Sequence, residues 1–552
     1  MNSLKQKFAV KKEACGWATR PNIRVSNKIW LMIVILVHFA CVKADKQVFM
    51  GMEDTEKRTN IMKEMVDEYA IDGKVALEYR EEKGTYTVTS KDIKNREDTI
   101  WLPPRTIMSV YDEIPFKATL INALSRIPDT NNFQPSPNNP QDFYSSTVLL
   151  AIQLLMNVNV NRSTLDSKFP EYKNVPLYIE NCKVCHDYVW SLPSYKDMDH
   201  PNQWEQEDHD FYNKISFTRL GFRDIKLFHK KLIDALHAEN TPESLFVAKE
   251  IVFDMKQYLW AYNIVNTRCF MLKLENYKKL YGENYGSILN MAINQKLVPQ
   301  QNNALLPIMD YLNMIVPQKQ DFEELSTEEV KKQYLRRFYL IVRDQKLYLQ
   351  VQGDFKQGQE YGFAYTTDLV CNSLISTYGF AVKDGVGQIM TLSLVNEIPA
   401  KNYKLCAVLN CVRNAKNLPK LKRMNYQFSF LDDSKEEESL LMLYRIAKYT
   451  IDSNITSKKD IEALGRSLRF KIDKYGYISI ENEIDAIGRA IDMLEQYLSQ
   501  KDLDIPEDLD QLPYRQRISY YCAIDQRNVI LWHITNLHGR LQLLLEKSIE
   551  EE

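Results

Sequence analysis

The pattern of hydrophobic and polar positions predicts a small sheet near the start of the chain. Residues 54–69 (DTEKRTNIMKEMVDEY) have the polar amphipathic pattern of a helix. Apolar and β-branched residues then alternate over 74–80, 85–90 and 99–102, which is typical of three strands. Gly84 lies in the first turn between them. We therefore expect one helix followed by a small twisted sheet.

The middle of the chain is mainly helical in pattern. An apolar run over 145–156 predicts a buried helix, and residues 217–236 and 248–262 have helical periodicity. A stretch rich in proline and asparagine, 127–142, predicts a surface loop before these helices. A strand-like pattern of residues occurs again at 339–352. Helices inserted between two strand-rich segments indicate an α+β fold.

The last part of the chain begins with two strand-like segments, 387–394 and 405–412. It then becomes helical with charged faces. The helices predicted there cover residues 436–449, 461–470, 480–498 and 516–550. We therefore expect a separate C-terminal helical domain.

Residues 355–380 (FKQGQEYGFAYTTDLVCNSLISTYGF) carry the pattern that most resembles a site. A turn signal and a short aromatic strand containing Tyr361 and Tyr365 come first. A helix-compatible run over 368–377 follows and ends at Tyr378 in a Tyr-Gly-Phe triplet. This combination of strand, helix and aromatic ending indicates more than a plain core segment.

Composition narrows the functional classes. The 552 residues are enough for two or three domains, and 45% hydrophobic with 26% charged residues is ordinary for a globular protein. Lys and Arg number 71 against 73 Asp and Glu, so nothing favours a nucleic acid partner. Glycine is sparse, at 17, and no Gly-rich phosphate-binding motif is present.

The N-terminus has the features of a targeting segment. A basic stretch precedes the apolar run 29–37, which continues through 39–42 and is short for a membrane span. Small residues at Val42 and Ala44 suit cleavage after residue 44, so 1–44 is interpreted as a signal peptide leading to the secretory pathway. The alternatives are a signal anchor, which would contact the membrane, a mitochondrial presequence, or a cytoplasmic or other organellar protein.

Cysteine and histidine offer weak candidates. The nine cysteines do not form a disulfide framework by spacing. Cys182 and Cys185 with His186 match the C-x-x-C-H pattern of haem attachment, but two ordinary, partly buried cysteines are the favoured interpretation. His200 and His209 are expected in a solvated loop and helix start. The sequence therefore predicts neither a catalytic triad nor a metal centre.

Two polar positions in apolar surroundings have two interpretations each. Arg268 ends the aromatic helical segment 258–270, where it is either a buried anion clamp or a surface cation that complements the helix dipole. Asp310 and Asn313 lie in the apolar segment 306–314. They either satisfy each other or cap a short helix, which is the favoured interpretation, or they form a polar clamp on a ligand.

Six blocks in this order resemble the SET-domain lysine methyltransferases of the Rubisco large-subunit methyltransferase type. The blocks are residues 84–109, 188–204, 258–270, 305–314, 355–380 and, near the C-terminus, 478–488 with 520–531. The resemblance covers about 76–541. It implies a β-rich split SET domain (73–395) after an N-terminal helix (45–72), with a helical insertion at about 145–255. An all-α substrate-binding domain (396–552) would follow.

The resemblance also implies a cofactor and its ligands. S-adenosylmethionine would lie against Gly84 and be held by Arg268, Asn313 and Met314. Met314 stands where the family has a histidine that acts largely through its backbone.

The resemblance further implies that Tyr365 and Tyr378 are catalytic and frame a channel for a lysine of a protein substrate. Thr366 and Cys371 depart from the family pattern. The implied activity is methyl transfer from S-adenosylmethionine to a lysine side chain. The alternative is a catalytically silent SET scaffold that binds proteins, and a haem-bearing subunit is a third hypothesis.

Overall fold

The chain is described from a computed structural model. The described residues are 51–551 except 81–83, 128–140, 218–219, 221–224, 283–300, 314–335, 366–370, 384–388, 394–407, 409–424, 430–434, 452–456, 476 and 502. All belong to the second of two compact units, Met50–Glu552. The predicted signal segment, 1–44, and most of the predicted loop over 127–142 lie outside them. No helix in the described ranges is long and apolar enough to cross a membrane.

The first strands follow the sequence pattern. Helix α3 (Thr55–Tyr69) begins at Asp54, whose side chain accepts a hydrogen bond from the backbone N–H of Lys57 and so caps the helix. Strands β1 (Val75–Arg80) and β2 (Gly84–Thr89) pair antiparallel. Gly84 is therefore the first residue of a strand, paired with Arg80, at the end of the turn in which it was expected.

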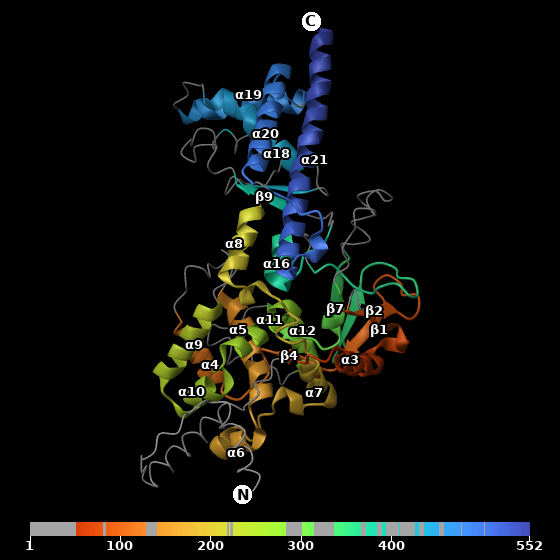
Figure 1. Cartoon of the computed structure of the whole chain (residues 1–552), viewed down its shortest axis with the longest axis vertical. Helices are drawn as coiled ribbons and strands as arrows, with labels where there is room; N and C mark the ends of the chain where they lie inside the picture. The colour runs from red at the N-terminus through yellow and green to blue at the C-terminus, as the bar shows by residue number, and fades with distance from the viewer. Residues whose placement is uncertain are drawn as a thin grey trace, which may run out of the picture. The chain divides into compact units, whose positions relative to one another are not determined.

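The other strands of the first half join segments far apart in sequence (Figure 1). One antiparallel sheet has the order β3–β8–β7, and another has the order β4–β6–β5. Their bounds are β3 Asp98–Leu102, β4 Met108–Ser109, β5 Cys269–Lys273, β6 Gln301–Leu305, β7 Phe338–Arg343 and β8 Lys346–Val351. The strands before the helical middle part thus pair with strands after it, which agrees with an inserted helical region.

The helical middle part has a buried centre. Helix α5 lies along α11, and both are almost entirely buried at their centres (Figure 1). The helices are α4 Lys117–Ser125, α5 Gln141–Asn159, α6 Arg162–Lys168, α7 Lys183–Trp190, α8 Gln206–Ile215, α9 Ile225–Glu239, α10 Pro242–Phe246, α11 Met255–Arg268 and α12 Leu274–Tyr281. Along the whole described chain there are also short 3₁₀-helices and one π-helix. The 3₁₀-helices are η1 Ile71–Gly73, η2 Pro104–Thr106, η3 Pro170–Tyr172, η4 Tyr178–Glu180, η5 Pro201–Gln203, η8 Met309–Tyr311 and η9 Leu509–Gln511, and the π-helix is η6 Val247–Ile251.

Two predicted helices differ from those found. The predicted helix over 248–262 is divided, because Asp254 accepts a hydrogen bond from Gln257 N at 2.7 Å and starts a new helix there. The apolar period continues across this break, so periodicity alone does not reveal it. The predicted helix over 217–236 begins only at Ile225 among the described residues.

The aromatic segment after β8 is less regular than predicted. In place of a strand at Tyr361 and Tyr365, single bridges pair Val88 with Glu360 and Ile93 with Phe355. Helix α16 (Cys371–Tyr378) follows and ends at the expected tyrosine.

The C-terminal part combines one strand pair with long helices. Strand β9 (Ile389–Ser393) pairs with β10 (Asn425–Ser429), so the prediction that 396–552 is all-α is wrong at β10. Of the predicted strand over 405–412, only Val408 is described, and it is helical. The helices are α18 Lys435–Ile451, α19 Lys458–Tyr475, α20 Ile480–Ser499 and α21 Tyr514–Glu551.

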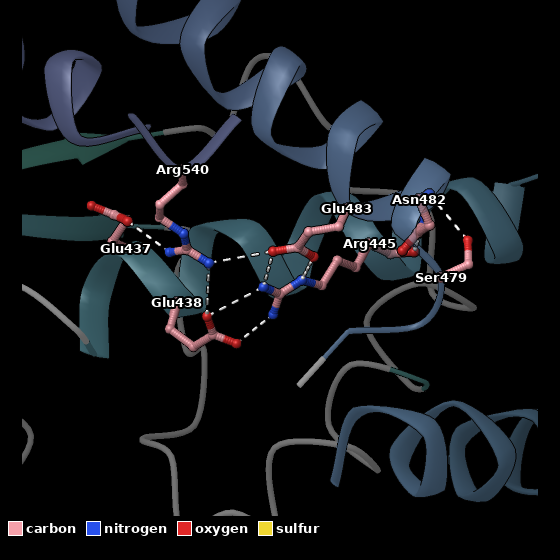
Figure 2. A network of polar contacts seen from close by, with 7 residues as sticks. All are labelled: Glu437, Glu438, Arg445, Ser479, Asn482, Glu483 and Arg540. Atoms are coloured by element: carbon pink, nitrogen blue, oxygen red, sulfur yellow. Dashed lines mark hydrogen bonds and ion pairs between the residues drawn. The ribbon is translucent and has the colours of Figure 1, made fainter. Parts of the chain in front are cut away.

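An ionic network is buried among α18, α20 and α21 (Figure 2). Arg445 is only 1% exposed, and its Nε and Nη2 each donate to Glu483 at 2.5 Å. It also pairs with Glu438. Arg540 donates to Glu437 at 2.8 Å and to Glu483 at 3.3 Å. Each buried charge of the network therefore has a partner of opposite charge, and these ion pairs join the three helices to one another.

A partly buried carboxyl, that of Asp112, follows β4. Its Oδ2 accepts a hydrogen bond from Ser109 N at 2.7 Å, and its main-chain oxygen accepts one from Lys117 Nζ at 2.9 Å. Burial raises the pKa of Asp112 to about 6 and lowers that of Lys117 to about 8. Both shifts oppose the charged forms that prevail at neutral pH.

We expect Asp112→Asn to reduce the pH dependence of stability between pH 4 and 7. The pKa of Asp112 is higher in the folded state, so its contribution is fully present below the unfolded pKa and is lost as the pH rises through about 6. The wild type should therefore lose up to about 3 kcal/mol over this range, a loss that the variant lacks. Urea unfolding at several pH values measures it. Asp344→Asn, in the exposed β7–β8 turn, is the control, and parallel wild-type and Asp112→Asn curves would contradict the assignment.

Candidate functional site

One cavity brings together four of the six predicted site residues. It has a volume of about 350 Å³ and is lined by Arg268, Asn313, Tyr365 and Tyr378, with further residues from α3, β2 and the chain after α7. Gly84 does not line it, although its neighbour Thr85 does. Met314 lies outside the described residues.

Arg268 is held inside this cavity by a buried carboxylate. As the last residue of α11, it places Nη1 at 3.3 Å from both the main-chain oxygen and Oδ2 of Asp310. Tyr188 of α7 donates its hydroxyl to the same Oδ2 at 2.8 Å, and the side chain of Asp310 is fully buried. Arg268 does end α11, as one interpretation expected, but its side chain is only 24% exposed and pairs with Asp310, so it is a half-buried cation and not a surface one.

In the Arg268–Asp310 pair, each charged group stabilises the charged form of the other. Burial raises the pKa of Asp310, and the Arg268 guanidinium together with the Tyr188 hydroxyl opposes that rise. Burial lowers the pKa of Arg268 and is the largest single effect, but Asp310 and three neighbouring tyrosines together outweigh it, so the net direction is upward. Arg268 is therefore a permanent cation in the cavity wall.

Arg58, which the sequence did not single out, adds a second guanidinium to the cavity. It projects from α3, and its Nη1 donates to Asp197 Oδ2 at 3.4 Å. Burial lowers the pKa of Arg58, and the nearby charge of Arg268 lowers it further. Each guanidinium already pairs with a carboxylate of the lining, and a bound anionic group would further reduce the repulsion between the two cations. In sequence, Arg58 is one of many charged residues on a polar helix, and nothing local separates it from the others.

The cavity also offers an unused acceptor. Among the described residues, Asp310 Oδ1 is buried and has no hydrogen-bond partner. Asn313 donates from Nδ2 to Thr85 O at 3.4 Å, so Asp310 and Asn313 bond to different partners and do not satisfy each other. A buried carboxylate oxygen without a donor is costly, and a ligand with an N–H or O–H group would satisfy it.

Two tyrosines form an aromatic part of the cavity wall. The ring centroids of Tyr365 and Tyr378 are 4.8 Å apart, and the Tyr365 hydroxyl donates to Leu312 O at 2.8 Å. Burial raises the pKa of Tyr365, and it raises the pKa of Tyr378 to about 12. Both hydroxyls are therefore neutral at physiological pH and act as hydrogen-bonding groups.

The backbone beside Tyr378 is fixed by one buried and one partly buried polar side chain. His200 Nε2 lies 3.2 Å from Thr377 O, and Asn266 Nδ2 donates to the same oxygen at 3.1 Å. Gly379 has φ +78°, and a Cβ there would lie 3.0 Å from Met198 O. The expectation that His200 lies in a solvated loop is thus wrong. Its ring is buried because α16 and α11 pack over it.

Cys182 and Cys185 are bonded to each other in a disulfide at the start of α7. Neither sulfur is then available for a thioether bond to haem, which removes the basis of the third hypothesis, and the favoured interpretation as two unbonded cysteines is also wrong. His209, expected at an exposed helix start, is buried. In the described part of the chain, no group of three or more His, Cys, Asp and Glu side chains could hold a metal ion.

Comparison with known proteins returns solved structures only. No family model and no curated protein matches the chain. The SET domain of LSMT bound to lysine and AdoHcy has 13% identity and a TM-score of 0.45, over 89% of this chain and 93% of that chain. The SET domain of LSMT bound to methyllysine and AdoHcy has 14% identity and a TM-score of 0.45, over 90% and 93%. Rubisco LSMT bound to AdoMet has 14% identity and a TM-score of 0.45, over 89% and 92%.

This chain is similar to structures of Rubisco LSMT. The sequence blocks resemble the same group of proteins. Because the identity is 13–14% and the TM-score is 0.45, the function proposed below is based on the geometry of the cavity.

Proposed function

We propose that this protein transfers a methyl group from S-adenosylmethionine to a lysine side chain of a protein substrate. The observation that carries the proposal is the content of one cavity. It contains two guanidinium groups and a buried carboxylate as well as a pair of neutral tyrosines at 4.8 Å. The first set suits the amino-acid part of the cofactor, and the second suits a lysine chain.

The residues present fit the cofactor. Its carboxylate matches Arg268 and Arg58, since guanidinium groups bind carboxylates by charge-assisted hydrogen bonds. Its ammonium or ribose hydroxyl groups match Asp310 Oδ1, which has no partner among the described residues. The cavity of about 350 Å³ lies within the usual range for small-molecule sites. When bound, the cofactor supplies the electrophilic methyl group.

The tyrosines suit the handling of a lysine amine. A lysine has a pKa of about 10.4 and must lose a proton before it can attack. Burial against aromatic rings disfavours the ammonium form and so promotes that loss. The Tyr365 hydroxyl donates its proton to Leu312 O, which leaves its oxygen lone pairs as acceptors for the N–H groups of the amine. Tyr365 therefore orients the amine, and Tyr378 forms the wall beside it.

One observation favours the silent scaffold as a second candidate. Cys371, which stands where the family has an asparagine, is fully buried in an apolar cluster with Tyr212, Ile518 and Cys522. It is not among the residues that line the cavity. The Cys371 side chain packs between α16, α8 and α21, and it does not supply the amide that an asparagine would supply.

We expect Tyr365→Phe to bind S-adenosylhomocysteine with nearly wild-type affinity and to transfer methyl groups about tenfold to a hundredfold more slowly. The lost hydroxyl orients the amine in the transition state and contributes little to the cofactor site. Calorimetry measures the affinity, and transfer of a tritiated methyl group to an array of lysine peptides measures the rate.

Tyr361→Phe is the matched control, since its hydroxyl is hydrogen-bonded to Thr99 and lies outside the cavity lining. An unchanged rate in Tyr365→Phe would remove this residue from the mechanism. Binding of S-adenosylhomocysteine by a wild type that methylates no peptide would favour the silent scaffold. No binding by the wild type would overturn both the cofactor assignment and the enzyme.

A further inference from the structure

The disulfide at the start of α7 has an asymmetric setting. Cys182 is the N-cap residue and is partly exposed, whereas Cys185 is fully buried. Cys185 N donates a hydrogen bond to Cys182 Sγ at 3.2 Å. Cys185 Sγ lies 3.2 Å from Arg105 O. The residue that carries one sulfur is thus partly exposed, and the residue that carries the other is fully buried.

The same contacts would stabilise the reduced pair. A Cys182 thiolate would keep the hydrogen bond from Cys185 N and gain from its place at the positive end of α7. A Cys185 thiol would have Arg105 O as its acceptor. The Cys182 sulfur therefore has a hydrogen-bond donor in both states, whereas the Cys185 sulfur gains Arg105 O as an acceptor only when the bond is open and it carries a proton.

The other described cysteines lack such a setting. Cys371 and Cys522 are fully buried. Burial raises the pKa of Cys269 to about 12, so its thiolate is disfavoured. Thiol reactivity follows exposure and thiolate stability, and within the described ranges Cys182 is the cysteine that meets both conditions.

The helix that carries this pair also reaches the cavity. Tyr188, on the turn after Cys185, donates its hydroxyl to Asp310 Oδ2 at 2.8 Å. Ser191, which caps the C-terminal end of α7, is hydrogen-bonded through its hydroxyl to that of Tyr311 at 2.9 Å. Hydrogen bonds therefore connect α7, within one turn of the disulfide, to Asp310, the residue that holds Arg268.

We propose that Cys182–Cys185 is a thiol–disulfide exchange site for external dithiols and that its redox state adjusts the cavity through α7. A dithiol thiolate attacks Cys182 Sγ, the Cys182–Cys185 bond breaks, and Cys185 leaves as a thiolate that takes a proton. The second thiol of the reductant then attacks its own mixed disulfide and releases Cys182. The protein gains two electrons and two protons, and the dithiol becomes a cyclic disulfide.

The exchange step is tested on the full folded chain. The protein is equilibrated with mixtures of reduced and oxidised dithiothreitol, quenched with acid and alkylated, and the peptides are analysed by mass spectrometry. We expect Cys182 and Cys185 to convert together in a two-electron titration. A pair that is reduced only after unfolding in urea would overturn the proposal.

Single variants test which sulfur is attacked. With oxidised glutathione, we expect Cys185→Ser to form a mixed disulfide at Cys182. We expect Cys182→Ser to leave the buried Cys185 unmodified. Equal modification of both variants would contradict the assignment of Cys182 as the exposed partner.

The transmission step rests on the proposed function, because its readout is the affinity for S-adenosylhomocysteine. We expect reduction to weaken binding by up to about tenfold, the scale of one hydrogen bond to a charged group. Tyr188→Phe should remove the dependence on redox state, because it lacks the hydroxyl that links α7 to Asp310.

Equal affinities of the oxidised and reduced wild type would overturn the transmission step and leave the proposed function intact. If neither state binds S-adenosylhomocysteine, the proposed function fails, together with the transmission step that rests on it. The exchange site is then decided by the titration alone.

Discussion

Replacing Arg268 with alanine is expected to weaken binding of S-adenosylhomocysteine by about 30-fold or more. The ligand carboxylate loses a hydrogen bond to a charged group, which is worth about 1.5–3 kcal/mol. The change also lowers the stability of the fold, because the other charge of the pair is left buried and unpaired. Here the other charge is Asp310, whose side chain is fully buried and keeps only Tyr188 as a hydrogen-bond donor to Oδ2. The ligand carboxylate also loses one of its two cations.

Calorimetry on the purified chain measures this effect, and two variants separate binding from stability. Arg96→Ala is the control, since this exposed arginine donates to the Tyr339 hydroxyl and does not line the cavity. The double variant Arg268→Ala with Asp310→Asn removes both charges and should recover part of the lost stability without recovering the affinity. Wild-type affinity in Arg268→Ala would exclude this arginine from the cofactor site.

The replacement Glu483→Ala is expected to lower the free energy of unfolding by about 3–5 kcal/mol, since it leaves a buried cation unpaired. Glu483 accepts two hydrogen bonds from Arg445 at 2.5 Å and one from Arg540 at 3.3 Å. After the change, the Arg445 guanidinium keeps one partner among the described residues, Glu438, which is 35% exposed. The midpoint of urea unfolding, followed by circular dichroism, measures the loss.

Glu495→Ala is the matched control, because Glu495 lies on α20 as well and its side chain is 56% exposed. It should change the free energy of unfolding by less than about 0.5 kcal/mol. Replacing Arg445 and Glu483 together with methionine and leucine tests the network further, since apolar residues of similar size often substitute for a buried ion pair at little cost. Equal urea midpoints for Glu483→Ala and the wild type would show that the network does not stabilise the fold.

Local patterns were sufficient for most of the helices and strands. The alternation over 74–80 and 99–102 gave β1 and β3, and the long helical periods gave α18 to α21. These patterns succeed because they report which face of an element is buried. They failed where a single polar side chain overrides the period, as Asp254 does at the start of α11.

The sequence identified some residues of the candidate site and missed others. Tyr365 and Tyr378 were named from sequence through the family resemblance, and they do meet at 4.8 Å. Arg268 was named as well, but its burial and its partner Asp310 were left open. Arg58 was missed, because a charged residue on a polar helix has no local signal of the cavity that it enters.

The sequence by itself therefore determined the α+β order of elements and most of their bounds, since these depend on neighbours within a few positions. The family resemblance named several residues of the candidate cavity. The tertiary structure decided which of those residues share one cavity and which charges are buried. It also decided that His200 is covered and that Cys182 and Cys185 are bonded. These features depend on contacts between segments far apart in the chain, such as Arg268 with Asp310, and no local pattern encodes that proximity.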